Sequence, residues 1–428
     1  MNIALVSALI FLFALSVPVA VAIALSAIFG ITFFSNLPLL VVPQKMFNAL
    51  DSFPLLAIPF FILAGNIMTR GGVSRRLVDF AKGLVGGVQG GLASSCVITC
   101  MIFAAISGSS VATTFAVGAI LIPAMVKHGY PTPVAATIQA ASAELGVVIP
   151  PSIPMILYAV ATETSVTQLF IAGIGPGLVI GVALLVMVQI WCRLKGYGKE
   201  DGANREPFLK VTLNAFWALM LPVIIIGGIY GGIFTPTEAA AVSAVYALVV
   251  GLFVYRELKF SDLPDIFRIS AVSTGAVMLI IAAAGLFSFL VSLSDIPSLI
   301  GSWARGSFDS WITFLLFVNV LLFVVGMFVE TSAAILVLAP ILAPVAVAYG
   351  VDPVHFGIIM IVNLAMGMIT PPLGVNLFAA ATVARTPVQS MFRPLVFPVT
   401  SVILSLALIT YIPAITLWLR DMSVAAGG

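Results

Sequence analysis

The sequence predicts an all-α, polytopic membrane protein that contains an inverted repeat, two re-entrant helical hairpins and two broken transmembrane helices. Composition places the chain in the membrane, because 61% of its 428 residues are hydrophobic and only 8% are charged. Soluble domains have an apolar share of about 45–50%. Apolar runs such as 178–188 also lack the alternation of membrane β-strands. The repeat follows from a third observation, an internal duplication.

A pattern of Pro and Gly residues occurs twice, with a spacing of 221 positions. The pairs are 120–123 (Ile-Leu-Ile-Pro) with 341–344 (Ile-Leu-Ala-Pro), Gly129 with Gly350, Gly146 with Gly367, and Pro150-Pro151 with Pro371-Pro372. Proline removes a backbone donor and clashes with the preceding turn, so each Pro-Pro pair is expected to unwind a helix. Duplicated breaks of this kind are typical of membrane proteins with a central binding site.

Nine segments are apolar and reach the length of about 20 residues that a crossing takes. They are 3–34, 53–69, 132–162, 169–192, 212–234, 237–254, 270–293, 353–384 and 394–418. Segment 3–34 has no basic front end and no small-residue cleavage site, so we expect a retained helix rather than a signal peptide.

Residues 90–127 and 310–349 are interrupted near the middle by polar or small residues. Their legs are short for a crossing, which predicts re-entrant hairpins with tips buried in protein.

Lys and Arg residues give the orientation. If the amino terminus is cytoplasmic and both hairpins return to the side they entered from, fifteen of the 18 Lys and Arg residues face the cytoplasm. The exceptions are Lys45, Arg305 and Arg420. The first hairpin then opens to the cytoplasm and the second to the periplasm, so the two units form an inverted repeat.

Each broken segment offers groups that can bind a cation and groups that can bind an anion. Carbonyls freed by the prolines and nearby hydroxyls are ligands for a hard cation such as Na⁺, and the helix amino terminus beyond the prolines favours an anionic group. The hairpin tips add polar groups, Ser107-Gly108-Ser109-Ser110 in the first and Glu330-Thr331-Ser332 in the second. The alternatives are a structural kink at the prolines and close helix packing at the serines.

Three acids lie in or near apolar segments, where a carboxylate is a functional candidate. Glu144 precedes the first break, and Glu330 lies at the second tip. Each is a candidate to neutralise a bound cation, or to pair with backbone donors near the break. Glu238 is expected to be structural, because Thr235, Pro236 and Glu238 fit a capping box at the start of a helix.

Several function classes are disfavoured. Cys96, Cys100 and Cys192 are expected to pack in apolar segments, and His128 and His355 to be structural or interfacial, with pH sensing as the alternative. The chain has no HExxH motif, no Asp inside a predicted span and no GxxxxGK[ST] loop. We therefore expect neither an enzyme nor a direct user of ATP. No basic tract points to nucleic acid.

Four stretches resemble the large membrane subunit of TRAP (tripartite ATP-independent periplasmic) transporters, and the resemblance runs from end to end. They are 53–65, 105–113, 146–151 and 231–240. The resemblance implies an elevator-type, Na⁺-driven importer of the ion transporter superfamily in the bacterial inner membrane. It implies three further partners besides lipid: a small four-helix membrane subunit, expected to be a separate polypeptide; a periplasmic substrate-binding protein; and an organic acid. Na⁺ is the coupling ion, and no organic cofactor is expected.

The resemblance also implies a domain division and a substrate class. Scaffold helices occupy 1–89 and 212–309, a cytoplasmic linker occupies 193–211, and the moving transport domain consists of 90–192 and 310–428. The substrate is expected to be sialic acid or another sugar acid, or a C4-dicarboxylate, with an acidic sugar favoured. A channel or binding-protein-independent anion transporter is the alternative function.

By position, the resemblance assigns one Na⁺ to the first tip and one to the second. The assigned sodium ligands are Ser107, Gly108, Ser109, Ser110 and Gly146 for the first ion, and Glu330, Thr331, Ser332, Gly367 and Thr370 for the second. The expected substrate-binding residues are Ser109, Ser110, Pro150, Pro151, Pro371, Pro372 and Asn376. Because the second tip lacks the serine cluster of the first, the two ligand sets are expected to differ.

Overall fold

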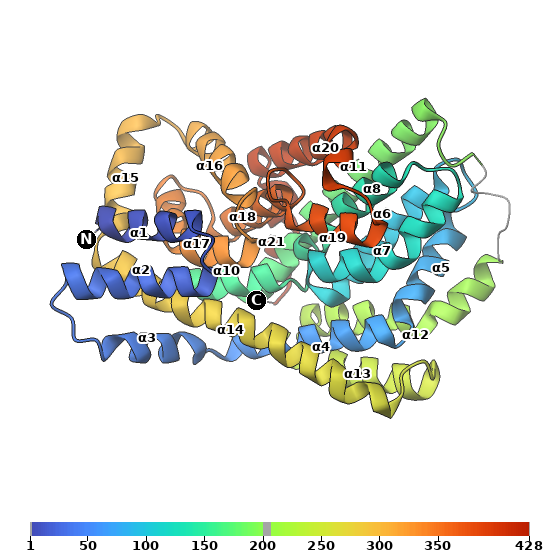
Figure 1. The fold of residues 1–428 in the computed structure, drawn as a ribbon, viewed down its shortest axis with the longest axis horizontal. Helices are drawn as coiled ribbons and strands as arrows, with labels where there is room; N and C mark the ends of the chain where they lie inside the picture. Colours follow the sequence, from blue (N-terminus) through green and yellow to red (C-terminus); the bar gives the residue numbers. More distant parts are fainter. Residues whose placement is uncertain (1, 200–206, 428) are drawn as a thin grey trace.

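The computed structural model describes residues 2–199 and 207–427, and all regular secondary structure within these ranges is helical (Figure 1). The helices are α1 (Asn2–Ala14), α2 (Val19–Phe34), α3 (Val41–Leu50), η1 (Phe53–Leu56), α4 (Ala57–Arg70), α5 (Val73–Val85), α6 (Gly91–Ser107), α7 (Ser110–Lys127), α8 (Thr132–Ala143), α9 (Leu145–Val148), α10 (Ile153–Thr162), α11 (Val166–Lys195), α12 (Phe208–Tyr230), α13 (Pro236–Val249), η2 (Val250–Val254), η3 (Phe260–Asp262), α14 (Leu263–Leu293), α15 (Ile296–Ser307), α16 (Trp311–Gly326), α17 (Thr331–Ala348), α18 (Pro353–Met368), α19 (Val375–Ala384), η4 (Val388–Met391), α20 (Phe392–Tyr411) and α21 (Ala414–Gly427). Within the described ranges, eight helical segments are long and apolar enough to cross a bilayer, or nine if the bent pair at 132–148 and 153–162 counts as one span. The predicted all-α, multi-pass architecture is confirmed.

The helices form two groups that lie side by side (Figure 1). Helices α2, α3, α4, α13 and α14 lie along one side, where α13 packs on α4 and α14 packs on α2 and α3. The other group contains the two hairpins and the broken helices, where α16 packs on α18, α11 on α20, and α19 on α7 and α8. Helix α14 contacts both α4 and α17 and so joins the two groups. The candidate site lies at this boundary.

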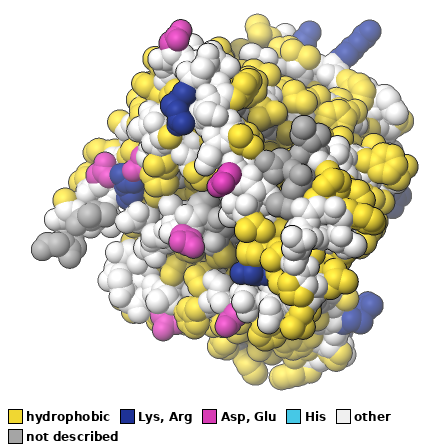
Figure 2. All heavy atoms as spheres, turned by 90° about the vertical axis from the view of Figure 1, so that its left-hand side faces the viewer, with side chains coloured by type: hydrophobic (Ala, Val, Ile, Leu, Met, Phe, Trp, Pro, Cys, Tyr) yellow, Lys and Arg dark blue, Asp and Glu magenta, His cyan; other side chains and the backbone are white. Residues whose placement is uncertain are grey.

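The outer surface is strongly apolar. Large hydrophobic side chains such as Leu194 (76% exposed), Phe47 (73%) and Leu209 (71%) point outward. Figure 2 views the end of the molecule that is on the left in Figure 1, and it shows hydrophobic side chains around much of the outline and acidic side chains across the end face. An extensive exposed apolar surface marks contact with lipid or another protein.

The predicted single span at 3–34 is wrong. The segment forms two helices, α1 and α2, separated by a turn in which Ser16 has a φ of 58°. A Cβ placed on Gly30 would lie 3.2 Å from Leu5 Cδ1, so the two helices pack against each other in opposite directions. Pro18 supplies the physical reason, because the residue before a proline is disfavoured in the α region. The premise of one crossing at the start of the chain therefore fails. Every Lys and Arg lies after α2, so their assignment to the two sides of the membrane stays a prediction.

The predicted span at 394–418 is also wrong at its carboxyl end. Helix α20 ends at Tyr411, and α21 begins at Ala414 and packs on α11. A Cβ on Gly175 of α11 would fall on the carbonyl oxygen of Ile415, which shows how closely the two helices approach. Pro413 breaks the helix because it has no N–H to donate.

Helices α5 and α15 were not predicted. Each lies directly before one of the hairpins, and α5 packs on α6 while α15 packs on α17. Each is preceded by a residue in the left-handed conformation, Gly72 with a φ of 75° and Asp295 with a φ of 50°. The sequence interpretation considered only segments long and apolar enough to cross, and these two helices are short and amphipathic.

The interruptions of the hairpins and of the two long segments lie where the sequence predicts. The first hairpin breaks at 108–109 and the second at 327–330. The first Pro-Pro pair lies between α9 and α10, where the segment bends by 41°, and the second lies between α18 and α19. Both Pro-Pro peptide bonds are cis.

The predicted linker 193–211 is helical at both ends, since α11 continues to Lys195 and α12 begins at Phe208. Its central residues 200–206, including Arg205 of the predicted cytoplasmic set, lie outside the described residues. Residues 1 and 428, which bound the predicted domains, also lie outside them.

Candidate binding site at the hairpin tips

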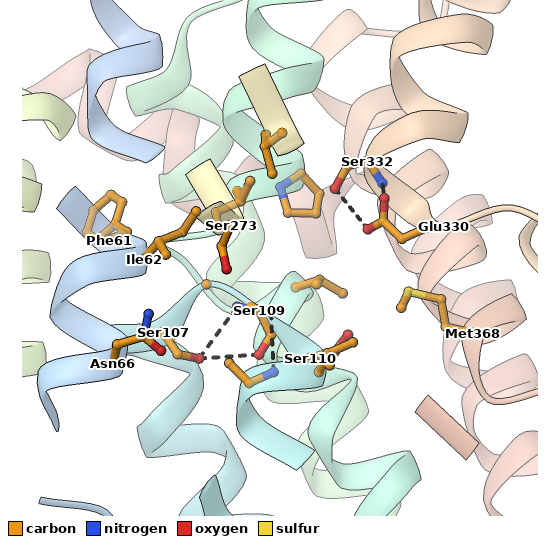
Figure 3. A pocket seen from close by; sticks show the side chains of 18 of the residues that line it. Phe61, Ile62, Asn66, Ser107, Ser109, Ser110, Ser273, Glu330, Ser332 and Met368 are labelled. Atoms are coloured by element: carbon orange, nitrogen blue, oxygen red, sulfur yellow. Dashed lines mark hydrogen bonds between the residues drawn. The ribbon is translucent and has the colours of Figure 1, made fainter. Parts of the chain in front are cut away.

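The two hairpin tips line one cavity of about 330 Å³. Ser107, Ser109 and Ser110 reach it from the first tip, and Glu330 and Ser332 reach it from the second (Figure 3). The third wall comes from α4 and α14 of the other helix group. The cavity therefore lies at the boundary between the two groups, and each repeat contributes a helix amino terminus to it.

The first tip is fixed by its close contact with the first break. Gly108 ends α6 with a φ of 61°, and its carbonyl oxygen accepts a hydrogen bond from Ile153 N at 3.3 Å. A Cβ at this position would lie 3.0 Å from the Pro151 carbonyl oxygen. Glycine is required here both because the left-handed conformation disfavours a side chain and because the second backbone is so near.

Oxygen atoms gather beneath the first tip. Thr113 Oγ1 donates to the Ser109 carbonyl oxygen at 2.7 Å and lies 3.0 Å from Ser107 Oγ. A Cβ on Gly146 would lie 2.8 Å from both the Ser109 oxygen and Thr113 Oγ1, so the absence of a side chain at Gly146 lets the broken helix approach this cluster. Carbonyl and hydroxyl oxygens are the ligands that hard cations prefer. The donor set therefore fits Na⁺.

The second tip is organised around a carboxylate. Glu330 lies 221 positions after Ser109, and both residues are N-caps, of α17 and α7 respectively. Glu330 Oε2 accepts from Ser332 N at 2.9 Å and from Ala333 N at 3.2 Å, while Glu330 Oε1 accepts from Ser332 Oγ at 2.9 Å. Its negative charge thus lies at a helix amino terminus, where it is favourable.

The second tip also touches the second broken helix through glycine. Gly326 and Gly367 are in backbone contact, because a Cβ on Gly367 would coincide with the backbone of Gly326. Met327 O accepts a hydrogen bond from Leu373 N at 3.3 Å, just beyond the second Pro-Pro pair. Each tip is therefore held by the broken helix that follows it in the sequence.

The predicted site residues divide into three groups. Lining the cavity are Ser107, Gly108, Ser109, Ser110, Glu330 and Ser332. Packed next to the tips without lining the cavity are Gly146, Thr331 and Gly367, of which Thr331 Oγ1 contacts Met368 Sδ at 2.9 Å. Away from the cavity lining are Thr370, whose hydroxyl donates to Met366 O at 2.9 Å, the four prolines Pro150, Pro151, Pro371 and Pro372, and Asn376.

Asn376 is fully buried, and its amide bonds to other side chains. Asn376 Nδ2 donates to Glu144 Oε1, and Asn376 Oδ1 accepts from Thr114 Oγ1 at 3.2 Å. These contacts place Asn376 behind the first hairpin. Glu238 and Thr235 form the predicted capping box at the start of α13 and also lie outside the cavity lining.

The sequence interpretation missed the residues of α4 and α14. Asn66 and Ser273 line the cavity, and Asn66 Nδ2 donates to Ser270 Oγ at 2.9 Å. A signal was present, because Asn66 is a carboxamide inside the apolar segment 53–69. Among the described residues, no Lys or Arg lines this cavity, and Glu330 is the charged residue at its wall.

A multi-pass helical fold in which two helical hairpins, each followed by a broken helix, meet at one cavity is typical of membrane transport proteins. The family model described as "Tripartite ATP-independent periplasmic transporter, DctM component" matches residues 6–415. The chain belongs to this family.

Two proteins are similar to this chain in sequence, and one solved structure is similar in fold. The "C4-dicarboxylate TRAP transporter large permease protein DctM" of Pseudomonas aeruginosa is 47% identical over 378 residues, which cover 88% of each chain. The "Sialic acid TRAP transporter large permease protein SiaM" of Vibrio cholerae is 37% identical over 384 residues, 90% of each chain. The crystal structure of the Alcanivorax borkumensis YdaH transporter superposes with a TM-score of 0.68 at 14% identity, over 98% of this chain and 99% of that one, and so shares the fold.

Proposed function

We propose that this chain is the transport subunit of a Na⁺-coupled TRAP transporter that imports a C4-dicarboxylate. The observation that carries the proposal is the meeting of both hairpin tips in one cavity against α4 and α14. Each tip comes from one copy of a duplicated unit and is contacted by the broken helix of the same copy. Such a construction lets one site be presented to the two sides of a membrane in turn.

Sodium would bind at the first tip through oxygens of Ser107, Ser109 and Thr113, next to Gly146. The second ion would bind near Glu330, Ser332 and Gly367. The described part of the lining contains no Lys or Arg, so an anionic substrate would depend on the amino terminus of α7, on hydroxyl groups and on the charge of the bound cations. Cation binding thereby favours anion binding, which is the thermodynamic basis of symport.

The moving domain would consist of 90–192 and 310–428, with the remaining helices as the scaffold. The hairpins are re-entrant and the repeats inverted in this proposal. Length alone does not require re-entrancy, since α7 and α17 each reach 18 apolar residues. The support comes from the tips, which dock against breaks in the middle of long apolar segments. Helices α5 and α15 connect the scaffold to the two hairpins and would flex at Gly72 and Asp295 during an elevator movement.

The substrate and partners follow from the relatives. A C4-dicarboxylate is proposed because the relative at 47% identity carries that name, and this replaces the acidic sugar to which the resemblance to the family had inclined us. A sialic acid is the second candidate, on the name of the relative at 37% identity. A small membrane subunit and a periplasmic binding protein are the proposed partners in the bacterial inner membrane.

The test is uptake of radiolabelled succinate and sialic acid into proteoliposomes that contain the chain and its small membrane partner. The binding protein and an inward Na⁺ gradient are each present or absent. Uptake of succinate that requires both supports the proposal. Flux that needs neither the gradient nor the binding protein contradicts it and favours a channel.

A further inference from the structure

Glu144 is a buried carboxylate that the hairpin-tip site does not use. It lies between α8 and α9, two residues before Gly146, and only 4% of its surface is exposed. It does not line the cavity at the tips. Its position in the middle of the predicted span 132–162 places it far from bulk water, where an acid is expected to have a specific partner.

The partners of Glu144 come from both repeats. Asn376 of α19 donates a hydrogen bond from Nδ2 to Glu144 Oε1 across 232 positions of sequence. Thr114 of α7 donates from Oγ1 to Asn376 Oδ1 at 3.2 Å and also lies 3.0 Å from the Ser110 carbonyl oxygen. Asn376 and Thr114 are both fully buried. The three side chains therefore form one enclosed polar cluster behind the first hairpin.

One oxygen of this cluster has no partner. Glu144 Oε2 is buried and makes no hydrogen bond with any described residue. The contrast with Glu330 is direct, because both oxygens of Glu330 accept hydrogen bonds at the amino terminus of α17. A buried carboxylate oxygen without a donor or a counter-charge is strongly unfavourable. No described residue donates a hydrogen bond to Glu144 Oε2, so this oxygen remains available to a bound cation.

We propose that Glu144, Asn376 and Thr114 form a cation site for Na⁺, additional to the ions at the two tips. The available donors are the Glu144 carboxylate, the Asn376 amide oxygen, the Thr114 hydroxyl and the Ser110 carbonyl. All are hard oxygen ligands. The inference rests on the proposed Na⁺ coupling and extends it, since an ion at this cluster joins the first hairpin and the first break to α19 of the second repeat.

The experiment measures equilibrium binding of ²²Na⁺ to the purified full chain in lipid nanodiscs, with no substrate present. Glu144→Gln keeps an oxygen that accepts from Asn376 but removes the charge. Glu163→Gln makes the same chemical change at an exposed residue beyond α10 and serves as the control. We expect Glu144→Gln to bind one Na⁺ fewer per chain at saturation, and Glu163→Gln to match the wild type.

A second variant keeps the test decisive if Glu144→Gln does not fold. Thr114→Val removes one oxygen ligand at similar volume, and we expect the Na⁺ concentration that half-saturates one site to rise by about tenfold. Unchanged stoichiometry in Glu144→Gln, or unchanged affinity in Thr114→Val, overturns the third site while sodium coupling stands. A wild-type chain that binds no Na⁺ overturns both this site and the proposed coupling.

Discussion

Ser109 and Glu330 occupy equivalent positions in the two repeats, and each caps a helix whose amino terminus opens into the same cavity. One cap is a neutral hydroxyl and the other is a carboxylate. The two tips therefore share an N-cap at the equivalent position, while the charge of that cap differs. Because only the second cap carries a charge, substitutions at the two tips are expected to have different effects.

Replacement of Ser109 by Leu should abolish Na⁺-dependent uptake without preventing membrane insertion. The larger side chain enters the cavity, and the loss of the cap to Ala112 N costs about 1 kcal/mol. The measurement is uptake in proteoliposomes at matched protein amounts. Ser165→Leu is the control, because Ser165 caps α11 at an exposed position and makes the same kind of bond to Gln168 N. Sodium stimulation that survives in Ser109→Leu would count against a cation at this tip.

Gly108→Ala should lower both stability and uptake. The left-handed conformation alone costs an alanine about 1–2 kcal/mol, and the contact with the Pro151 oxygen adds to it. Gly129→Ala is a matched control, because Gly129 has a φ of 83° and open space around its Cβ position. The difference in Tm between the two variants isolates the contact between the tip and the break. Equal Tm values for the two variants would show that this contact contributes nothing.

Glu330→Gln should raise the Na⁺ concentration for half-maximal uptake at least tenfold, a typical effect for a group that supports a bound metal. The substitution preserves shape and one acceptor but removes the negative charge that faces the cavity. The measurement is the Na⁺ dependence of initial uptake rates at saturating substrate. Glu238→Gln provides the comparison, since Glu238 also caps a helix but lies outside the cavity lining. A Na⁺ dependence identical to wild type in Glu330→Gln would remove Glu330 from the second site.

Asp352 forms an ion pair with Arg420 that links the start of α18 to α21, with Arg420 Nη1 donating to Asp352 Oδ2 at 2.7 Å. Burial raises the pKa of Asp352, but the hydrogen bond and charge of Arg420 and the N–H groups of Val354 and His355 outweigh burial and hold the pKa below its usual value. A depressed pKa in the folded state means that this carboxylate stabilises the fold above its unfolded-state pKa, about 3.9. The contribution is lost as pH falls through the folded-state pKa.

Asp352→Asn should therefore reduce the free energy of unfolding at pH 7 by about 1 kcal/mol. Asn retains the ability to cap α18, so the change isolates the ion pair. The measurement is Tm from pH 7 down to the most acidic pH at which the protein stays soluble, and the difference from wild type should shrink below about pH 4. Asp421→Asn, at the more exposed partner of Arg420, should have a smaller effect. A pH-independent difference would assign the loss to capping rather than charge.

The sequence was sufficient for the breaks because proline and glycine act locally. The interruptions at 108–109 and 149–152 need no information about neighbours, since the residues at the break themselves disfavour a helix. The turn at Ser16 also had a local signal in Pro18, but the sequence interpretation judged segment 3–34 by length and hydropathy alone, and these could not separate one long helix from two short ones. Composition also gave no reason to look for α5 and α15, whose place depends on the hairpins that they precede.

Only the part of the site that depends on local sequence was predicted. Residues at the tips could be found from local pattern, whereas the bond between Asn66 and Ser270 joins residues 204 positions apart and that between Asn376 and Glu144 joins residues 232 positions apart. Only the folded chain brings these pairs together. Asn376 was assigned to the substrate on the resemblance alone, and the structure places the buried carboxylate of Glu144 next to it.

The capping of α17 by Glu330 gives the two ends of the cavity different charge. At the α17 end, the outward-facing N–H groups of Ser332 and Ala333 are already satisfied by the chain's own carboxylate. At the α7 end, the cap is a hydroxyl without charge. A substrate with two different ends would therefore bind in one preferred orientation. A symmetric diacid would present the same group to each end of the cavity in either orientation.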